Sequence, residues 1–461
     1  MLDLVLDLLN LPGVVPVDLR TGNKCIIVVA NVADGDVPHC PDCHKPMYRH
    51  GRRTNVFADT PLQMQPVRLE ISRPRYRCTS CGAMVTPELT FLDEKRRATK
   101  RLVDAIRERC LGMTFHSLAR QTGLAVNTIK SITHDLIEDL ERTVRYETPV
   151  IMGIDEVNLA GGMRCVITNL VTNNVFQMLE FRTREHLQPF FENLPDKEKV
   201  EWVCTDMWRP FKRSFSQYLP NARLVIDKFH VVAMASEALE TVRKKYQATL
   251  ERMDRIKVKK SIGWLTLKRP QNLSQQEIEA LAVVRQVIPE LAVAYDVKEA
   301  FHRIYDDPDK ASAMRAFEAW ENSLPDELEG FRSLARTVHN HYEDIFAYWD
   351  SPSRITNAYT EGLNGLTKVA NRMGRGYSYE IIRAKMLYAK YARKVGSGVR
   401  VADKPESSQT VEYGPHIPTL VEIAESGRDC RIWRSGLTGN ESNQEHLVLG
   451  PPMLPISNQR G

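Results

Sequence analysis

The chain has 461 residues, of which 43% are hydrophobic and 26% charged, with a formal net charge of +5. This length exceeds one compact domain and predicts two to four. The sequence contains no apolar stretch long enough to span a membrane. Its partly apolar start is interrupted by Asp3 and Asp7 and has no basic region before it, which argues against a signal peptide. Without a secretion signal, paired cysteines favour metal binding over disulfides.

Residues 1–94 are predicted to form an N-terminal lobe, with a strand in CIIVVANV (residues 25–32). Two cysteine pairs follow, and the segment between them contains strand-like sequences that can carry one pair to the other. Four thiolates suit a tetrahedral zinc ion, which would stabilise a small lobe; two unrelated pairs or a redox motif are the alternatives. The predicted zinc ligands are Cys40, Cys43, Cys78 and Cys81. This lobe is rich in basic residues, which would form either a phosphate-binding surface or a solvated face. They are Arg49, Arg52, Arg53, Arg68, Arg73, Arg75 and Arg77.

Residues 95–147 are predicted to form a helix-turn-helix region. Its first part, residues 95–113, has the pattern of a basic amphipathic helix. A second helix runs from a Thr114 cap to Gln121, Gly123 ends it, and a third helix spans residues 126–140. The third helix would enter the major groove of DNA, although two short helices joined at a glycine also occur as plain packing elements. The candidate DNA contacts are Arg120, Asn127, Thr128 and Lys130.

Residues 148–230 are predicted to form the first part of a sheet-containing core. Residues 149–181 read as three consecutive strands, broken by Gly161-Gly162 and by Asn173-Asn174. The first strand, residues 150–154, is apolar throughout, as expected of a strand buried on both faces, and Asp155 stands at its end. An acid in this position is an ion-pair member, a cap or a metal ligand.

The next elements predict where a second acid lies. A helix at residues 184–193 is followed by a strand ending in Asp206, a helix at residues 208–218, and a strand ending in Asp227. Three antiparallel strands followed by strands alternating with helices is the order of a ribonuclease-H-like sheet. In that order the fourth strand lies beside the first, so Asp206 is expected next to Asp155, and Asp227 one strand further out. We therefore take Asp206 as the second acid.

Residues 231–350 are almost wholly helical in pattern and too long for a loop, which predicts an inserted all-α subdomain. Its first half is basic and contains Trp264. This predicts a surface for the DNA backbone, with the tryptophan stacking on an unpaired base; a solvated helix with a core tryptophan is the alternative. The basic residues are Arg243, Lys244, Lys245, Arg252, Arg255, Lys257, Lys259, Lys260, Lys268 and Arg269.

Residues 351–395 are predicted to return to the core with a third acid. Asn357, Glu361, Asn364 and Lys368 recur at helical spacing and line one polar face. Arg372 and Arg375 follow directly. An exposed helix would also show this pattern, but Glu361 is the only acid on the face. Residues 396–461 are polar and rich in proline, serine and glycine, which predicts a poorly ordered tail.

Asp155, Asp206 and Glu361 together predict two-metal phosphoryl chemistry, in which carboxylates hold a pair of magnesium or manganese ions. The sequence contains no competing serine–histidine or cysteine–histidine arrangement and no glycine-rich phosphate loop. It therefore predicts a metal-dependent nuclease core with DNA-reading attachments. The flanking candidates for DNA contact are Lys228, His230, Asn357, Asn364, Lys368, Arg372 and Arg375.

With these motifs in their order, the chain resembles the DDE transposases of bacterial insertion sequences, specifically the ISL3 family. The resemblance covers about residues 40–395 in order, with Thr356 where the family usually has serine. It implies a zinc-binding lobe, a helix-turn-helix, a ribonuclease-H-like core with an all-α insertion, and Asp155, Asp206 and Glu361 as the catalytic triad. The matching motifs are CPDC and CTSC, GIDE at Asp155, CTDMW at Asp206, DKFHVV at Asp227, and TNAYTEGLNGLTK with GRGYSY around Glu361.

The resemblance also implies the substrate and the reaction. The substrate would be double-stranded DNA, namely the element's terminal inverted repeats and the target. Water would attack at the element's end and free a 3′-hydroxyl, which then attacks target DNA without a covalent protein–DNA bond. A homodimer on DNA and a location at the bacterial nucleoid in the cytoplasm are expected. There are two alternatives. One is a transposase-derived DNA-binding regulator, although a protein that does not cut DNA has no physical reason to keep all three acids. The other is a general nuclease, which would not need two DNA-recognition modules.

Overall fold

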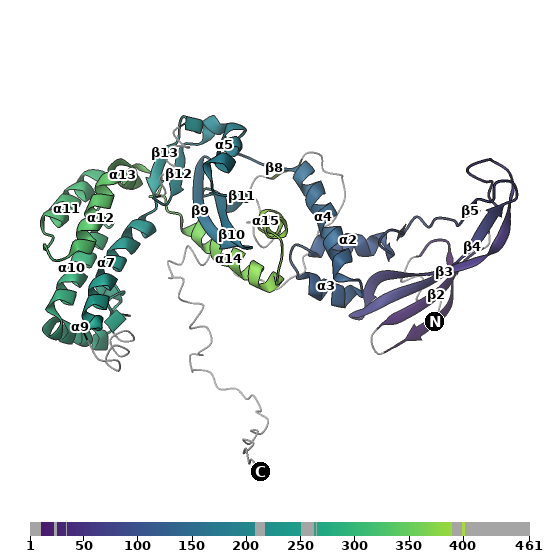
Figure 1. Ribbon diagram of the computed structural model, residues 1–461, viewed down its shortest axis with the longest axis horizontal. Coiled ribbons are helices and arrows are strands. Elements are labelled where there is room, and N and C mark those ends of the chain that lie inside the picture. The colour runs from purple at the N-terminus through teal and green to yellow at the C-terminus, as the bar shows by residue number, and fades with distance from the viewer. Residues whose placement is uncertain are drawn as a thin grey trace, which may run out of the picture.

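Figure 1 shows the computed structural model of the protein, which describes residues 11–22, 25–33, 35–207, 217–249, 262–263, 265–389 and 399–401. The molecule is elongated: an N-terminal sheet lies at one end, three helices and a central sheet follow, and a group of helices lies at the other end. Within these residues, none of the helices combines the length and the apolar character needed to cross a membrane.

The N-terminal sheet is built on a long antiparallel ribbon of β3 (Met47–Leu62) and β4 (Gln65–Cys78). Gln63 and Met64 turn the chain between them, both with left-handed backbone, as in a type I′ hairpin. The sheet has the order β1-β2-β4-β3-β7-β6, with β5 on β4. Strand β2 confirms the predicted strand at residues 25–32, and the ribbon confirms strands between the cysteine pairs. The other strands are β1 (Val14–Thr21), β2 (Ile26–Val32), β5 (Met84–Val85), β6 (Leu92–Asp93) and β7 (Ala98–Thr99).

Three helices follow: α2 (Lys100–Arg109), α3 (Phe115–Thr122) and α4 (Val126–Thr143). The predicted pair of helices around Gly123 is confirmed, because the Thr114 side chain caps α3 and Gly123 ends it with a φ of 71°. A Cβ at Gly123 would also lie 3.1 Å from Pro66 of β4, so the turn packs tightly on the sheet. The prediction that the first helix begins at residue 95 is wrong: Thr99 caps α2, and the residues before Lys100 belong to a turn and to β7.

The central sheet has the order β11-β10-β9-β12-β13, with β12 parallel to both of its neighbours. This order confirms that the fourth strand of the core lies beside the first. The expectation that Asp155 ends its strand is wrong: β9 continues to Leu159, where a two-residue turn at Ala160 and Gly161 leads into β10. The elements are β9 (Ile151–Leu159), β10 (Gly162–Asn169), β11 (Asn174–Leu179), α5 (Arg184–Glu192), η1 (Lys197–Lys199), β12 (Trp202–Thr205) and β13 (Arg223–Ile226).

From β13 to residue 350 the described residues form helices joined by short connections, as predicted, and these helices share a hydrophobic cluster rich in aromatic side chains such as Phe317, Trp320 and Phe346. This cluster reaches the central sheet through Val225 and Ile226 of β13. Residues 208–216, Trp264 and the basic residues 252–260 of the sequence predictions lie outside the described residues. The helices are α7 (Lys228–Ala248), η2 (Pro270–Asn272), α9 (Gln275–Val287), α10 (Pro289–Ile304), α11 (Lys310–Asn322), α12 (Glu329–Asn340) and α13 (Tyr342–Asp350).

The chain then returns to the central sheet with α14 (Ala358–Gly374), which packs on β9 and β10, and α15 (Tyr379–Tyr388), which packs on β11 and α4. One hydrophobic cluster joins α2, α3 and α4 to β9, β10, β11, α14 and α15. The three N-terminal helices and the central sheet therefore share a core. A short antiparallel pair, β8 (Val144–Tyr146) with β14 (Val399–Val401), completes the described elements; residues beyond 401 lie outside them.

Candidate active site and metal centre

Three elements bring Asp155, Asp206 and Glu361 to one place. Asp155 lies in β9, Asp206 directly follows β12, which pairs with β9, and Glu361 lies in the first turn of α14. Burial raises the pKa of Asp155, and the negative charges of Asp206 and Asp227 raise it further. Burial likewise raises the pKa of Glu361, with further contributions from Asp227 and Asp155. The acids therefore face a common site and repel one another.

Asp227 and His230 lie in this site too, where the sequence predicts only a DNA contact for His230. The ligand atoms of Asp227, His230 and Glu361 all lie within 4.8 Å of one another. Asp227 is fully buried; its Oδ1 accepts a hydrogen bond from the Asn357 backbone N–H at 3.2 Å, and its Oδ2 lies 3.4 Å from His230 Nδ1. The nearby Asp227 carboxylate raises the pKa of His230 to about 9. The signal in the sequence is an acid followed three residues later by histidine where a helix begins.

The two asparagines of the predicted polar face, at the start of α14 and within it, pack on β9. The Asn357 side chain donates to the Ile154 carbonyl at 2.9 Å, and the Asn364 side chain donates to Asp155 Oδ2 at 2.7 Å. Between them, the hydroxyls of Thr360 and Thr168 lie 2.7 Å apart. Asn357 is 0% and Asn364 5% exposed, so neither side chain presents a surface in this structure, and their DNA contacts stay predictions. The two side chains fix α14, and with it Glu361, against the strand that carries Asp155.

This close packing depends on Gly153 of β9. A Cβ there would lie 2.5 Å from the side-chain oxygen of Asn357 and 2.6 Å from the hydroxyls of Thr168 and Thr360. We expect Gly153→Ala to lower the free energy of unfolding by about 1–3 kcal/mol, because α14 must move away from β9. Denaturant-induced unfolding measures this change. Gly365→Ala is the control, since open space surrounds that position within α14 and alanine there should stabilise by up to about 1 kcal/mol. Equal midpoints for Gly153→Ala and the natural chain would contradict the prediction.

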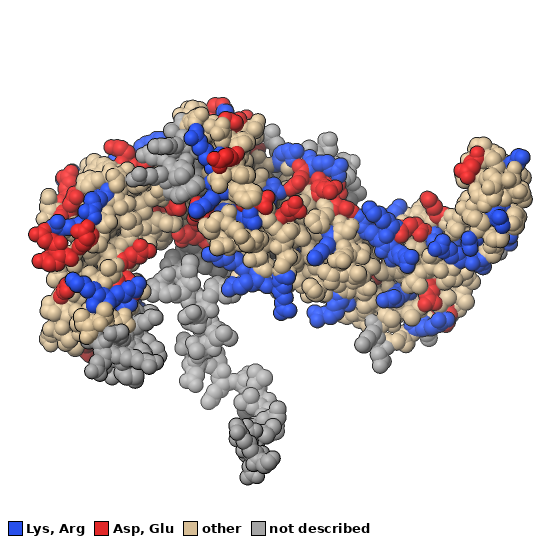
Figure 2. Space-filling model, viewed as in Figure 1, with Lys and Arg blue, Asp and Glu red and all other residues tan. Residues whose placement is uncertain are grey.

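The other predicted DNA contacts divide into exposed and partly covered side chains. Lys368, Arg372 and Arg375 are exposed at the C-terminal half of α14 and its end. Lys228 is partly buried, with its Nζ 5.5 Å from the Phe229 ring centroid and 5.6 Å from that of Tyr348. In Figure 2, Lys and Arg side chains gather beneath the end of α14 and beside α3. These regions offer a positively charged surface suited to phosphates.

The helix-turn-helix presents polar side chains at the start of α4. Asn127 and Lys130 are exposed, Thr128 is half-buried, and Arg120 is exposed in the last turn of α3. Ala125 precedes α4 without a side-chain cap, so the first backbone N–H groups of α4 have no capping side chain. A helix N-terminus with exposed polar side chains is the arrangement that reads a DNA groove.

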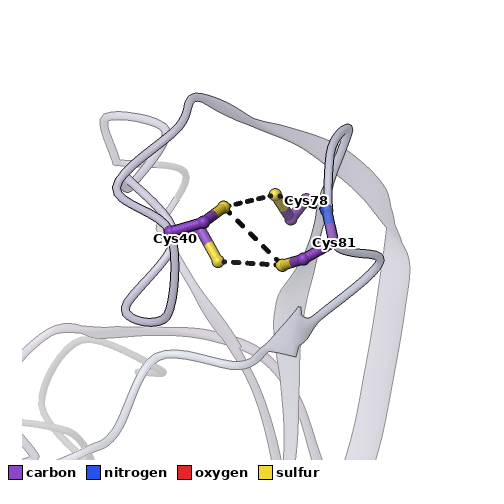
Figure 3. Close-up of side chains that lie close together, drawn as sticks. Cys40, Cys78 and Cys81 are labelled. Atoms are coloured by element: carbon purple, nitrogen blue, oxygen red, sulfur yellow. Dashed lines mark hydrogen bonds between the residues drawn. The ribbon is translucent and has the colours of Figure 1, made fainter.

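The four predicted zinc ligands meet at the end of the β3–β4 ribbon that is opposite the turn at Gln63 and Met64, and Figure 3 labels three of them. The sulfurs of Cys40 and Cys81 lie 3.5 Å apart, those of Cys43 and Cys78 3.5 Å, and those of Cys43 and Cys81 3.7 Å. These distances are too long for disulfides. They are close to the sulfur–sulfur separation of about 3.8 Å around a tetrahedral zinc ion with bonds of about 2.3 Å.

The loop that follows Cys78 favours the thiolate of this residue. The backbone N–H groups of Ser80 and Cys81 donate to the Cys78 sulfur, and these hydrogen bonds lower the pKa of Cys78 to about 6. In each pair the residue after the second cysteine is left-handed, with a φ of 56° at His44 and 75° at Gly82. The two loops therefore have a similar turn and direct their sulfurs to one point, as a structural metal centre requires.

Comparisons with known proteins cover most of the chain. Residues 152–386, more than half of it, match a family of transposases, the DDE transposases of the ISL3 group. Residues 87–137 match the helix-turn-helix domain of transposase family ISL3, and residues 36–81 match the zinc-finger of transposase IS204/IS1001/IS1096/IS1165. The chain is also 26% identical over 346 residues to the transposase for insertion sequence element IS1001 of Bordetella parapertussis, an alignment that covers 73% of this chain and 83% of that protein.

Proposed function

Because the chain belongs to the ISL3 family of transposases, we propose that it binds the terminal inverted repeats of an insertion sequence and cuts and joins DNA there. Asp155, Asp206 and Glu361 are the proposed catalytic residues. The observation that carries the proposal is the convergence of these acids from β9, β12 and α14. The central sheet order supports a ribonuclease-H-like core, in which the helices from α7 to α13 form an insertion before the helix that carries Glu361.

The acids fit divalent magnesium or manganese ions. Carboxylate oxygens are the ligands that magnesium prefers, and the raised pKa values of Asp155 and Glu361 reflect burial and repulsion that a cation at the site would relieve. When bound, such ions activate the attacking oxygen and stabilise the leaving oxygen of the phosphate. The chain itself orients one of the proposed ligands: the Asn364 side chain donates to Asp155 and fixes its carboxylate.

We assign Asp206 rather than Asp227 as the second metal ligand. Asp206 is only half-buried and lies at the end of β12, directly beside the strand of Asp155. Asp227 is fully buried and already accepts from the backbone at the start of α14 while it faces His230. Its proposed role is to hold the N-terminal end of α14, and thereby Glu361, at the site.

The exposed start of α4 supports a role in reading the repeat. We expect Asn127→Ala to raise the Kd for the repeat by roughly 5- to 150-fold, as loss of one bidentate base contact costs about 1–3 kcal/mol. The Kd for an unrelated duplex should change little. Electrophoretic mobility shifts at fixed salt measure both values. Glu138→Gln, further along the exposed face of α4, is the control. Equal weakening on both duplexes would mean that Asn127 reads no base.

The proposed function is tested with a labelled duplex that carries the element's own terminal repeat, incubated with the full chain and magnesium. We expect a nick at the repeat boundary that disappears with EDTA and returns with added magnesium. Tight binding without any nick would replace the enzyme by the alternative, a DNA-binding regulator. Since two ends must be joined in one complex, we also propose a homodimer on DNA, which light scattering of the complex tests.

A further inference from the structure

Helix α15 packs against the turn between α2 and α3, at the start of the helix-turn-helix. Lys385 Nζ donates to the carbonyl oxygens of Cys110 and Leu111 at 2.8 Å and of Met113 at 3.0 Å. These carbonyls follow the C-terminal end of α2, where helix carbonyls lack partners and carry partial negative charge. Lys385 is only 4% exposed, so its ammonium group serves this turn and not the surface.

The residue Tyr377 closes the other side of the same turn. Its hydroxyl accepts from the backbone N–H of Phe115, the first residue of α3, at 3.2 Å, and the two rings lie 4.8 Å apart. Tyr377 folds back under the end of α14 because position 374 is glycine: a Cβ there would lie 2.1 Å from the Tyr377 ring. Lys385 of α15 and Tyr377, which lies between α14 and α15, therefore provide hydrogen-bond partners for the carbonyls after α2 and for the N–H that begins α3.

Further contacts extend this junction to α4 and to the sheet. Arg383 pairs with Glu141 of α4 and donates to Gln177 of β11 at 3.1 Å, and the Tyr146 hydroxyl donates to the Leu387 carbonyl at 2.7 Å. From this corner, α14 runs back to Glu361 as one uninterrupted helix over about 20 Å. The DNA-reading helices and the helix of the third acid are thus joined directly.

We propose that Lys385 and Tyr377 are positioning residues that hold the helix-turn-helix at a fixed place relative to Glu361, so that they determine which phosphate of the bound repeat is cut. This inference rests on the proposed function. An apolar side chain would fill the site of Lys385 with a smaller desolvation cost. It would not orient the turn, whereas an ammonium group shared by three carbonyls allows one arrangement.

The test compares Lys385→Met with the natural full chain on the terminal-repeat duplex. We expect an unchanged Kd for the repeat, because the exposed face of α4 is untouched. Cleavage at the repeat boundary should fall by about tenfold or more, with new cuts at neighbouring phosphates, since small misplacement of reacting groups costs such factors. Hydroxyl-radical footprints should keep the protection given by the helix-turn-helix and lose or shift the protection next to it.

Two variants separate positioning from stability. Lys298→Met removes another buried lysine that donates to a main-chain carbonyl, but in the helices beyond β13, and should leave the cut position unchanged. Tyr377→Phe keeps the ring and removes one hydroxyl, so it serves as the test if Lys385→Met does not fold. It should give the same scattered cuts, but more weakly. Unaltered cut position and footprint in both junction variants would overturn the inference. If the natural chain binds without cutting, the proposed function fails and the choice of phosphate fails with it, while the footprints still show whether Lys385 and Tyr377 hold the helix-turn-helix in place.

Discussion

Replacing Glu361 by glutamine is expected to lower the rate of cleavage at the repeat boundary by about 10³-fold or more, while the Kd for the repeat stays the same. Glutamine keeps the shape of the side chain but removes a charge that we assign to metal binding. Metal-ion stabilisation of the transition state is worth several kcal/mol, and each 1.36 kcal/mol is a factor of ten in rate. Single-turnover cleavage of the labelled duplex in magnesium measures the loss.

The raised pKa of Glu361 gives this variant a second expected property. Its charge is unfavourable in the folded protein without metal, because of burial and the neighbouring acids. Glu361→Gln should therefore unfold at the same or a higher denaturant concentration than the natural chain, which separates a loss of function from a loss of structure. Glu380→Gln, at the exposed start of α15, is the matched control and should cleave normally. A normal rate for Glu361→Gln would remove Glu361 from the triad.

The same assay distinguishes Asp206 from Asp227. We expect Asp206→Asn to lose cleavage as Glu361→Gln does, and Asp227→Asn to retain measurable cleavage, because an amide oxygen can still accept from the Asn357 N–H. The reverse result would make Asp227 the second metal ligand, next to His230 and Glu361.

The strand order and the cysteine cluster could be predicted from the sequence because they depend on local patterns. Apolar runs, turn residues and tight CxxC spacing are visible in a few consecutive residues, and the order of strands and helices then restricts the topology. The position of Asp155 was less predictable, since the end of an apolar run does not end a strand whose next residues still pair with β10.

The asparagines of α14 show what periodicity cannot give. Helical spacing places Asn357, Glu361 and Asn364 on one face, but the same polar face suits open DNA or a buried strand. The two asparagines are buried because α14 packs closely on β9, a contact that Gly153 permits and that the helical spacing does not reveal. The approach of Glu361 to Asp227 and His230 similarly joins positions that lie far apart in the chain. Long-range contacts of this kind leave no signature in a single sequence.

The four-cysteine cluster leads to the prediction with the largest expected effect on structure. Removal of zinc should unfold the tip of the β3–β4 ribbon, because the small cluster there consists of Cys40, Met47, Tyr76 and Cys78 and has little apolar surface besides its own cysteines. Structural zinc contributes about 10–16 kcal/mol of apparent binding free energy in small zinc-binding peptides. We expect one zinc per chain by metal analysis, and rapid proteolysis between residues 36 and 85 after chelation.

The central sheet should survive this treatment, because the cysteine tip forms its own small cluster, which is separate from the hydrophobic clusters that contain the strands of the central sheet. Cys43→Ser should therefore act like chelation, with zinc lost, the tip cleaved and the central sheet resistant to protease. Cys25→Ser, a cysteine outside the cluster, should keep its zinc and its resistance. A Cys43→Ser chain with full zinc content and an intact tip would show that the four sulfurs do not share a metal, and would return the cysteine pairs to the redox or unrelated alternatives.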